Sequence, residues 1–348
     1  MYSIFLLITL TLILIIFLTL IFQNKFNYIF SLILSLFIIY LIINPVISIN
    51  SAIDGLTIFM KSIFPTLLPF LFCCNMLIYT NAINLYNKLF GFLFSKLFYL
   101  SQNSSFAVIS SYLCGYPIGA KYSTTLFENK KITKSEFSRL ISIASNASPL
   151  FLTSVVATSM LNNHKLGYLL LISSYFSSLI IALFLIKKED SSRIISNSSL
   201  PSNIYSFGES IKQSIEDSML TLINLCGYIV IFSILIGILQ DSIIFNNTLN
   251  ILSNLFGIPS DILTSFSLGL LELTNGCKLI STLDIALSTK LCIISFLASF
   301  GGLSIITQTF SFFSKHKISF KKYFFLKFLQ GLISATLMFF LCKVFFKL

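Results

Sequence analysis

The chain has 348 residues, of which 56% are hydrophobic and only 10% are charged, and its mean hydropathy is +0.92. Soluble domains carry about 25% charged residues and disordered chains have low hydrophobicity, so this composition excludes both classes. The net charge of +11 lies in short links between apolar runs and forms no basic face with interleaved aromatic residues, which argues against nucleic-acid binding.

Apolar runs recur along the whole chain, most of them close to the roughly 20 residues that a helix needs to cross a bilayer. We expect such segments at 4–22, 28–48, 56–80, 97–118, 140–160, 166–186, 219–239, 259–275, 290–313 and 323–342. The first run lacks a basic leader and a small-residue cleavage site, which favours an uncleaved span over a signal peptide. The predicted fold class is therefore an all-α polytopic membrane protein.

The links between the runs predict the orientation. Basic residues gather near 25, 88–96, 119–139, 187–193 and 315–327, and the positive-inside rule places all these links in the cytoplasm. The run 97–118 then begins and ends on one face, so we predict a re-entrant hairpin that ends in the helix-breaking motif GYPIG. The same argument makes 259–277 re-entrant from the opposite face. About eight spanning helices and two re-entrant hairpins result.

Two halves of the chain share an order of motifs. The motif GYPIGAK at 115–121 parallels ELTNGCK at 272–278, and each is followed by an apolar run interrupted midway, at 146–149 and at 301–304. The charge pattern orients the two halves oppositely, which predicts an inverted repeat with broken helices, as in many secondary transporters. Any set of similar apolar helices looks partly self-similar, but the matched polar breaks favour a true repeat.

This organisation predicts four parts of the chain. Two N-terminal transmembrane helices occupy residues 1–49, a first repeat 50–187, a polar cytoplasmic linker 188–216 and an inverted second repeat 217–348. The linker is too short to fold alone. Its charged residues Glu209, Lys212 and Glu216 have helical spacing, which predicts a solvated helical entry into the next span.

Five motifs carry a resemblance to a known family. They are GLTIFMKSIFPTLLPFLF at 55–72, GYPIGAK at 115–121, NASPLFL at 146–152, GLLELTNG at 269–276 and FGGLSIITQ at 300–308. Through them the chain, over about residues 50–348, resembles the sporulation integral membrane protein YlbJ (SpoVV) family of the nucleoside-recognition gate superfamily. Ala147 and Ser148 depart from the Gly or Thr that we expect in relatives, which predicts a change in the local packing at that break and no change in the role.

The resemblance implies a fold and a role. The two repeats would be gate repeats related to concentrative nucleoside transporters, and the protein would act late in sporulation. The family is implicated in moving dipicolinic acid, a small aromatic dicarboxylate, from the mother cell across the outer forespore membrane.

The helix breaks are the candidate substrate site, because freed backbone groups persist in a membrane only where they line protein or a wet cavity. Helix N-termini at the breaks favour carboxylates. Glu272 is the only acid in the apolar run 266–273, and it could carry a coupling proton, bind Na⁺ or pair with Lys278. Lys121 and Lys278 follow the two tips at equivalent positions and could hold an anion together, although Lys121 fits an ordinary cytoplasmic anchor equally well.

Neutral groups complete the predicted site. Tyr116 could stack on an aromatic ring, and polar side chains at the breaks offer hydrogen bonds, although each alone could serve helix packing instead. The predicted substrate-binding residues are Gly115, Tyr116, Lys121, Asn146, Ser148, Glu272, Thr274, Asn275, Lys278, Gly302, Ser304 and Gln308.

The sequence holds no catalytic constellation, cofactor fingerprint, ATPase module or metal-ligand spacing, and its seven cysteines form no CxxC pattern. We therefore predict an alternating-access transporter without enzymatic activity or cofactor, with H⁺ or Na⁺ as the candidate coupling ion. The expected partners are a small anionic substrate, the lipid bilayer, and a second copy of the chain or other sporulation membrane proteins. The alternatives are a transporter of nucleosides or other small solutes, or a structural or assembly component of the spore envelope.

The inverted topology makes a labelling prediction. Single cysteines within 113–118 are expected to react with a membrane-impermeant maleimide from the cytoplasmic side, and those within 272–277 from the other side, because the two hairpins enter from opposite faces. Intact cells and inside-out vesicles separate the two directions. The reverse pattern would contradict the topology.

Overall fold

The computed structural model describes residues 26–80, 89, 91–92, 96–186 and 206–346. The chain divides into two compact units, Met1–Asn50 and Ser51–Leu348. Several predictions lie outside the described residues: the first span at 4–22, most of the linker, and the basic residues Lys25, Lys88, Lys187, Lys188 and Arg193.

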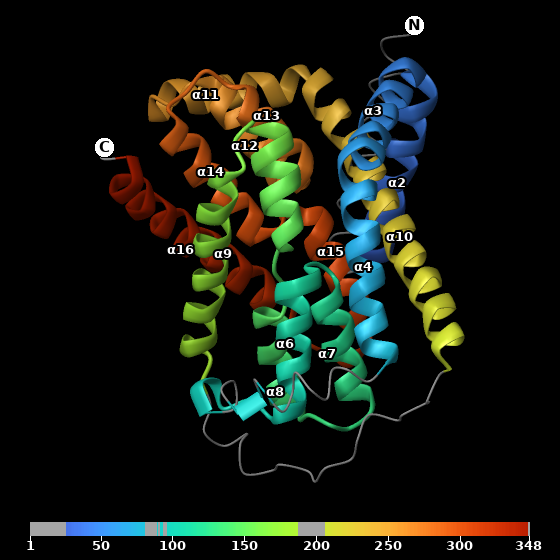
Figure 1. Cartoon of the computed structure of the whole chain (residues 1–348). Coiled ribbons are helices and arrows are strands. Elements are labelled where there is room, and N and C mark those ends of the chain that lie inside the picture. The colour runs from blue at the N-terminus through green and yellow to red at the C-terminus, as the bar shows by residue number, and fades with distance from the viewer. Residues whose placement is uncertain (1–25, 81–88, 90, 93–95, 187–205, 347–348) are drawn as a thin grey trace, which may run out of the picture. The chain divides into compact units, whose positions relative to one another are not determined.

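All regular elements of the described residues are helices, as the sequence predicts (Figure 1). In chain order they are α2 (Phe26–Ile43), α3 (Pro45–Ile58), η1 (Phe59–Ile63), α4 (Phe64–Tyr79), α6 (Gln102–Cys114), α7 (Ile118–Glu128), α8 (Lys134–Ile143), η2 (Phe151–Met160), α9 (Lys165–Phe184), α10 (Phe207–Asp241), α11 (Ile243–Phe256), α12 (Ser260–Leu271), α13 (Leu273–Thr282), α14 (Leu287–Phe300), α15 (Gly302–Phe313), η4 (Ser314–His316) and α16 (Phe320–Phe346).

Five helical stretches of the described residues are long and apolar enough to cross a membrane. They are Pro45–Tyr79, Lys165–Phe184, Phe207–Asp241, Leu287–His316 and Phe320–Phe346. The predicted number of about eight spans stays a prediction, since one predicted span lies outside the described residues. The solvated entry helix is present, because α10 begins at Phe207, where Ser206 and Glu209 form a capping box.

The two hairpins differ from their predicted bounds. In the first hairpin α6 runs to a tip at 115–117 and α7 returns alongside it, so the hairpin extends beyond 118 into the stretch expected to be a basic link. In the second, α12 and α13 meet at Glu272. The return limbs escape a hydropathy reading because they bury small and weakly polar residues. Figure 1 shows the hairpins on opposite sides of the second unit, with both tips directed toward its middle.

The two interrupted helices are present. The chain leaves α8 at Ala144 and becomes helical again at Pro149, two residues before the π-helical η2 begins at Phe151. The second break, between α14 and α15, is made by Gly301 and Gly302, whose φ angles of +92° and +71° lie in the left-handed region that glycine adopts without steric cost. Long helix, hairpin, interrupted helix and long helix therefore follow each other twice, as a repeat requires. The inversion of the two halves stays a prediction.

Small polar side chains join the long helices around the breaks. Ser295 of α14 bonds to Ser173 of α9 at 2.8 Å and to Ser334 of α16 at 2.7 Å, and all three side chains are fully buried. Gly331 lets α16 approach Phe296 of α14 closely. Close approach and short side-chain hydrogen bonds hold helices together where lipid removes the hydrophobic drive.

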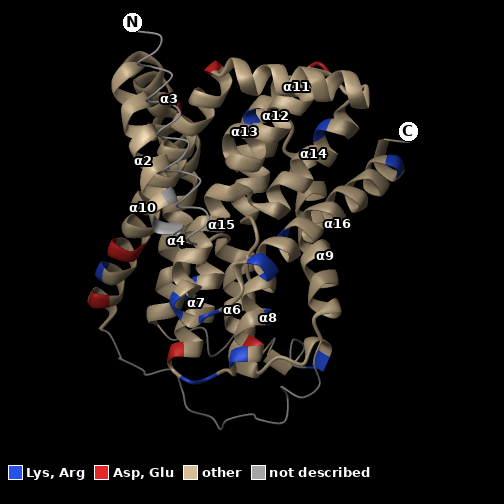
Figure 2. Ribbon diagram, turned by 180° about the vertical axis from the view of Figure 1, so that it is seen from behind, with Lys and Arg blue, Asp and Glu red and all other residues tan. Residues whose placement is uncertain are grey.

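The charged groups of the second unit gather mainly around α7, α8 and the start of α10, while the middle is almost free of them (Figure 2). His316, between α15 and α16, lies 3.0 Å from Glu128 at the end of α7, which brings two of the predicted cytoplasmic links together. Not all of their charges are solvated. Glu136 and Arg139 are buried in α8, where Glu136 accepts hydrogen bonds from Ser101 and Ser104.

The second hairpin depends on two facing glycines. A Cβ at Gly276 would lie only 2.2 Å from the Cα of Gly269, so Gly276→Ala forces the backbones of α12 and α13 apart. We expect a loss of about 1–3 kcal/mol in stability, seen as a lower melting temperature in detergent. Gly227→Ala is the control, because a Cβ there meets nothing within 4 Å. Equal melting temperatures of the two variants would contradict this packing.

Candidate functional site

The first hairpin tip lies against both interrupted helices. A Cβ on Gly115 would meet the backbone nitrogen of Ser148 at 2.6 Å, so the tip packs directly on the α8–η2 break. The hydroxyl of Tyr116 donates to the carbonyl oxygens of Ala298 and Ser299, at 3.2 and 3.3 Å, in the last turn of α14. One tip therefore touches two breaks.

The second hairpin tip joins the same place. A Cβ on Gly302 would meet the backbone nitrogen of Leu273 at 3.2 Å and two carbonyl oxygens of α12 at 3.3 Å. All four predicted breaks thus converge in the second unit, although they are far apart in the sequence. This convergence follows from the two-hairpin architecture and not from any local pattern.

A cavity opens where the breaks meet. Six of the predicted site residues line it: Tyr116, Ser148, Glu272, Thr274, Ser304 and Gln308. The rest of its wall is largely apolar or aromatic, from Ile63 and Leu67, Cys114, Ala147, Phe151, Leu225, Tyr228 and Ile229, Leu273, and Ile305. A mostly apolar wall with a few convergent polar groups is typical of a small-molecule site.

Two polar atoms of the wall have no partner. The Ser304 hydroxyl and the Gln308 Oε1 are buried, on side chains 2% and 3% exposed, and neither forms a hydrogen bond within the described residues. Both belong to α15, whose N-cap Gly301 offers no side-chain acceptor to the first amides. Buried polar groups without partners are rare in proteins, so these two mark a place where a ligand or water completes the bonding.

The carboxylate of Glu272 caps a helix and is not a free group in the cavity wall. It is the N-cap of α13 and accepts hydrogen bonds from the backbone N–H groups of Thr274, at 2.9 Å, and Asn275, at 2.7 Å. The positive end of α13 is therefore already occupied by an acid of the chain itself. Of the two helices that begin at the breaks of the second half, α13 and α15, only α15 has an N-terminus without a side-chain cap.

The predicted pair of lysines does not meet. Lys278 is exposed on α13 and does not line the cavity. Lys121 lies on α7, lines a different cavity and pairs with Asp217 of α10 at 3.6 Å. Residues at matched positions of the two hairpins point to different places because each return limb presents its own face.

The two predicted asparagines are engaged in packing. Asn146 donates to the Ile143 carbonyl at 2.8 Å and accepts from Gln330 of α16 at 3.0 Å. Asn275 donates to Ser233 of α10 at 2.8 Å. Neither lines the cavity, and both connect a break to a neighbouring long helix.

A second cavity adjoins the first on the side of Lys121 and Asp217. Tyr228 and Gln308 line both cavities and so form the partition between them. The remaining walls come from α7, α10 and α15. Since α7 ends at the charged end of the unit, this second cavity is a vestibule on the predicted cytoplasmic side.

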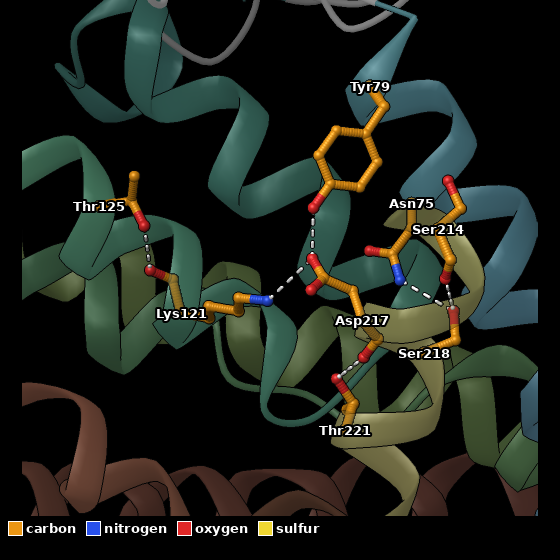
Figure 3. A network of polar contacts seen from close by, with 8 residues as sticks. All are labelled: Asn75, Tyr79, Lys121, Thr125, Ser214, Asp217, Ser218 and Thr221. Carbon is orange, nitrogen blue, oxygen red and sulfur yellow. Dashed lines mark hydrogen bonds and ion pairs between the residues drawn. The ribbon is translucent and has the colours of Figure 1, made fainter. Parts of the chain in front are cut away.

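A polar network closes one wall of the vestibule (Figure 3). Tyr79 of α4 and Lys121 of α7 both point toward the carboxylate of Asp217, and Asn75 bonds to Ser218, the next residue of α10. Lys121 and Asp217 retain 33% and 25% of their side-chain exposure. An ion pair this exposed contributes about 0–1 kcal/mol, so α7 can part from α10 at small cost.

Lys327 is a residue whose position the sequence did not reveal. The charge pattern assigns it to the basic link 315–327, yet α16 begins at Phe320 and the side chain of Lys327 is fully buried. Its ammonium donates to the Ser145 carbonyl at the α8–η2 break. Lys327 and Gln330, three positions apart in the otherwise mostly apolar stretch 323–333 of α16, are the signal that could have identified it.

Comparison with known proteins confirms the predicted resemblance. The chain is 26% identical over 321 residues to the sporulation integral membrane protein YlbJ of Bacillus subtilis (strain 168), covering 86% of this chain and 79% of that protein. No family model matches the chain.

Solved structures of CNTnw share the fold. CNTnw in an inward-facing substrate-bound state and a CNTnw variant in an outward-facing state both give a TM-score of 0.57 over 81% of this chain, and cover 75% and 76% of their own chains. The sequences are 14% identical, so the likeness concerns the fold. The protein is an integral membrane protein with an all-α fold like that of concentrative nucleoside transporters.

The polar atoms without partners, on Ser304 and Gln308, are expected to contribute nothing to the thermal stability of the protein. Gln308→Met and Ser304→Ala are expected to leave the melting temperature unchanged or raised, since they remove buried polar atoms that bond to nothing in the protein. Gln330→Met is the matched control. It strips partners from Lys327 and Asn146 and should cost about 1–3 kcal/mol. A melting temperature lowered equally by Gln308→Met would contradict the assignment of Gln308 to a ligand.

Proposed function

We propose that this protein is a sporulation membrane transporter that moves dipicolinic acid across the outer forespore membrane by alternating access. One observation carries the proposal: four helix breaks meet at a cavity that holds buried polar atoms without partners. The likeness to YlbJ supports the sporulation setting, and the fold shared with CNTnw supports transport.

The cavity offers matching groups to an aromatic dicarboxylic acid. The ring of Tyr116 and the apolar side chains of Phe151 and Ile305 suit the flat ring. The uncapped start of α15, together with the Ser304 hydroxyl, suits one carboxylate, because helix N-termini favour anions. The second carboxyl group would meet the Gln308 amide, which can accept from a protonated acid or donate to an ionised one.

Charge balance then assigns a role to Glu272. This residue is the one acid of the cavity wall, and the described residues that line the wall include no lysine or arginine. A dicarboxylate beside an ionised Glu272 would suffer like-charge repulsion in a low-dielectric site. We therefore assign the coupling proton to Glu272. The carboxyl group is protonated when the substrate is bound, so one proton and one substrate are occluded together.

Alternating access uses the partition and the vestibule. For the cavity to open toward the cytoplasm, Gln308 and Tyr228 must separate, and α7 must move from α10 across the Lys121–Asp217 pair. Motion of the hairpins relative to α4 and α10 would achieve both. No chemical step is needed, so the proposed protein is not an enzyme.

A neutral solute such as a nucleoside is the second candidate. The same lack of basic residues in the described wall favours it, since neutral hydroxyl and amide groups need only hydrogen bonds. A structural role in the spore envelope has less support, because a purely structural centre has no use for unpartnered Ser304 and Gln308.

Uptake of labelled dipicolinate into proteoliposomes tests the proposal. The purified chain is expected to exceed empty vesicles and to respond to an imposed proton gradient. Glu272→Gln should lose that response and take up dipicolinate at a rate that the gradient does not change, because a neutral amide does not repel the substrate but cannot carry the proton. Vesicles with and without the gradient are compared at equal protein content.

The control is Glu216→Gln, which neutralises an exposed acid of α10 and should behave as the wild type. Uptake of uridine in place of dipicolinate would select the neutral-solute candidate. A Glu272→Gln variant that still follows the proton gradient would remove the coupling role of this residue.

A further inference from the structure

The Lys327 ammonium is surrounded on three sides. It donates to the Ser145 carbonyl at 2.5 Å and to Oε1 of Gln330 at 2.8 Å, and it lies 5.2 Å from the centroid of the Tyr116 ring. The side chain is fully buried and forms no ion pair with any described acid. An ammonium has three N–H donors, so each one has a partner without any carboxylate.

These partners are the ligands that a monovalent cation takes in a membrane protein. Carbonyl oxygens freed where a helix unwinds, and the negative C-terminal ends of half-helices, coordinate cations in transporters. Ser145 supplies such a carbonyl just after the C-terminus of α8. Gln330 adds an amide oxygen, and Tyr116 adds the negative face of a ring.

The ligands are held in place by further hydrogen bonds. The amide nitrogen of Gln330 donates to Asn146, at 3.0 Å, and the hydroxyls of Ser145 and Tyr323 lie 2.9 Å apart. Two adjacent residues of the break, Ser145 and Asn146, are thereby fixed to α16. Without a cation the Ser145 carbonyl and the Gln330 Oε1 would be buried acceptors facing each other, which is costly.

We propose that the ammonium of Lys327 is a built-in cation of the α8–η2 break, which occupies a site that would otherwise hold a monovalent metal ion. The tether keeps the cation in place through the transport cycle, so the core assembles without Na⁺ or K⁺. The described residues also contain no cluster of three or more acidic, histidine or cysteine side chains that could hold a metal. Lys327 is a positioning residue: it fixes the break and, through the ring face, Tyr116 of the cavity wall.

Thermal stability of the purified full chain in detergent tests this inference, whatever solute is carried. The melting temperature of the wild type should be the same in sodium, potassium and choline chloride at equal ionic strength. Lys327→Ala should lower it by several degrees and leave an empty cation site. Methylammonium should then restore it, because the small cation fits the space and the ligands of the lost ammonium.

Lys343→Ala is the matched control, since Lys343 lies on the same helix and stacks on Phe339 at 4.7 Å but is exposed. This variant should melt as the wild type does and should not respond to methylammonium. If Lys327→Ala does not fold, Lys327→Met retains the volume of the side chain, and the salt comparison on the wild type stands by itself.

Two results would overturn the inference. One is a wild type that sodium or potassium stabilises over choline, which would show that a free metal cation still binds the core. The other is a folded Lys327→Ala or Lys327→Met variant as stable as the wild type. Failure of dipicolinate uptake alone would affect the proposed transport function and leave these outcomes unchanged.

Discussion

Backbone polar groups cannot be left without partners inside a bilayer, and the part of the chain that the structure describes has four helix breaks at its cavity. That constraint organises the second unit. The breaks lie against one another: Gly115 packs on Ser148, and Gly302 packs on the tip at Leu273. The Tyr116 hydroxyl of the first tip donates to two carbonyl oxygens at the end of α14. Where the breaks converge, the side chain of one break therefore supplies a hydrogen-bond partner to backbone carbonyls beside another.

The two buried charges beside the breaks follow the same electrostatic logic. Glu272 accepts from amides at the positive start of α13, and Lys327 donates to a carbonyl beyond the negative end of α8. Each charge is stabilised by helix ends and not by an opposite side chain. By contrast, α15 begins without a side-chain cap, and its Ser304 hydroxyl and Gln308 Oε1 have no hydrogen-bond partner. The ligand site that we propose therefore lies against α15.

The packing between helices is tight on one side of the cavity and weak on the other. Ser173, Ser295 and Ser334 join α9, α14 and α16 through fully buried hydrogen bonds. By contrast, α7 meets α10 across a vestibule and the partly exposed Lys121–Asp217 pair. A tight side and a weakly tied side around one cavity are what alternating access requires.

The sequence by itself determined the helical membrane class, the four breaks and the resemblance to YlbJ, because hydropathy and the Gly, Pro and polar interruptions are local signals. Only the tertiary structure decided which polar residues serve the cavity. Lys121 and Lys278 match in sequence yet lie apart, Asn146 and Asn275 turn to neighbouring helices, and Lys327, counted with a basic link, is buried at a break. These differences depend on which face each helix presents to its neighbours, and that is set by contacts between segments distant in the chain.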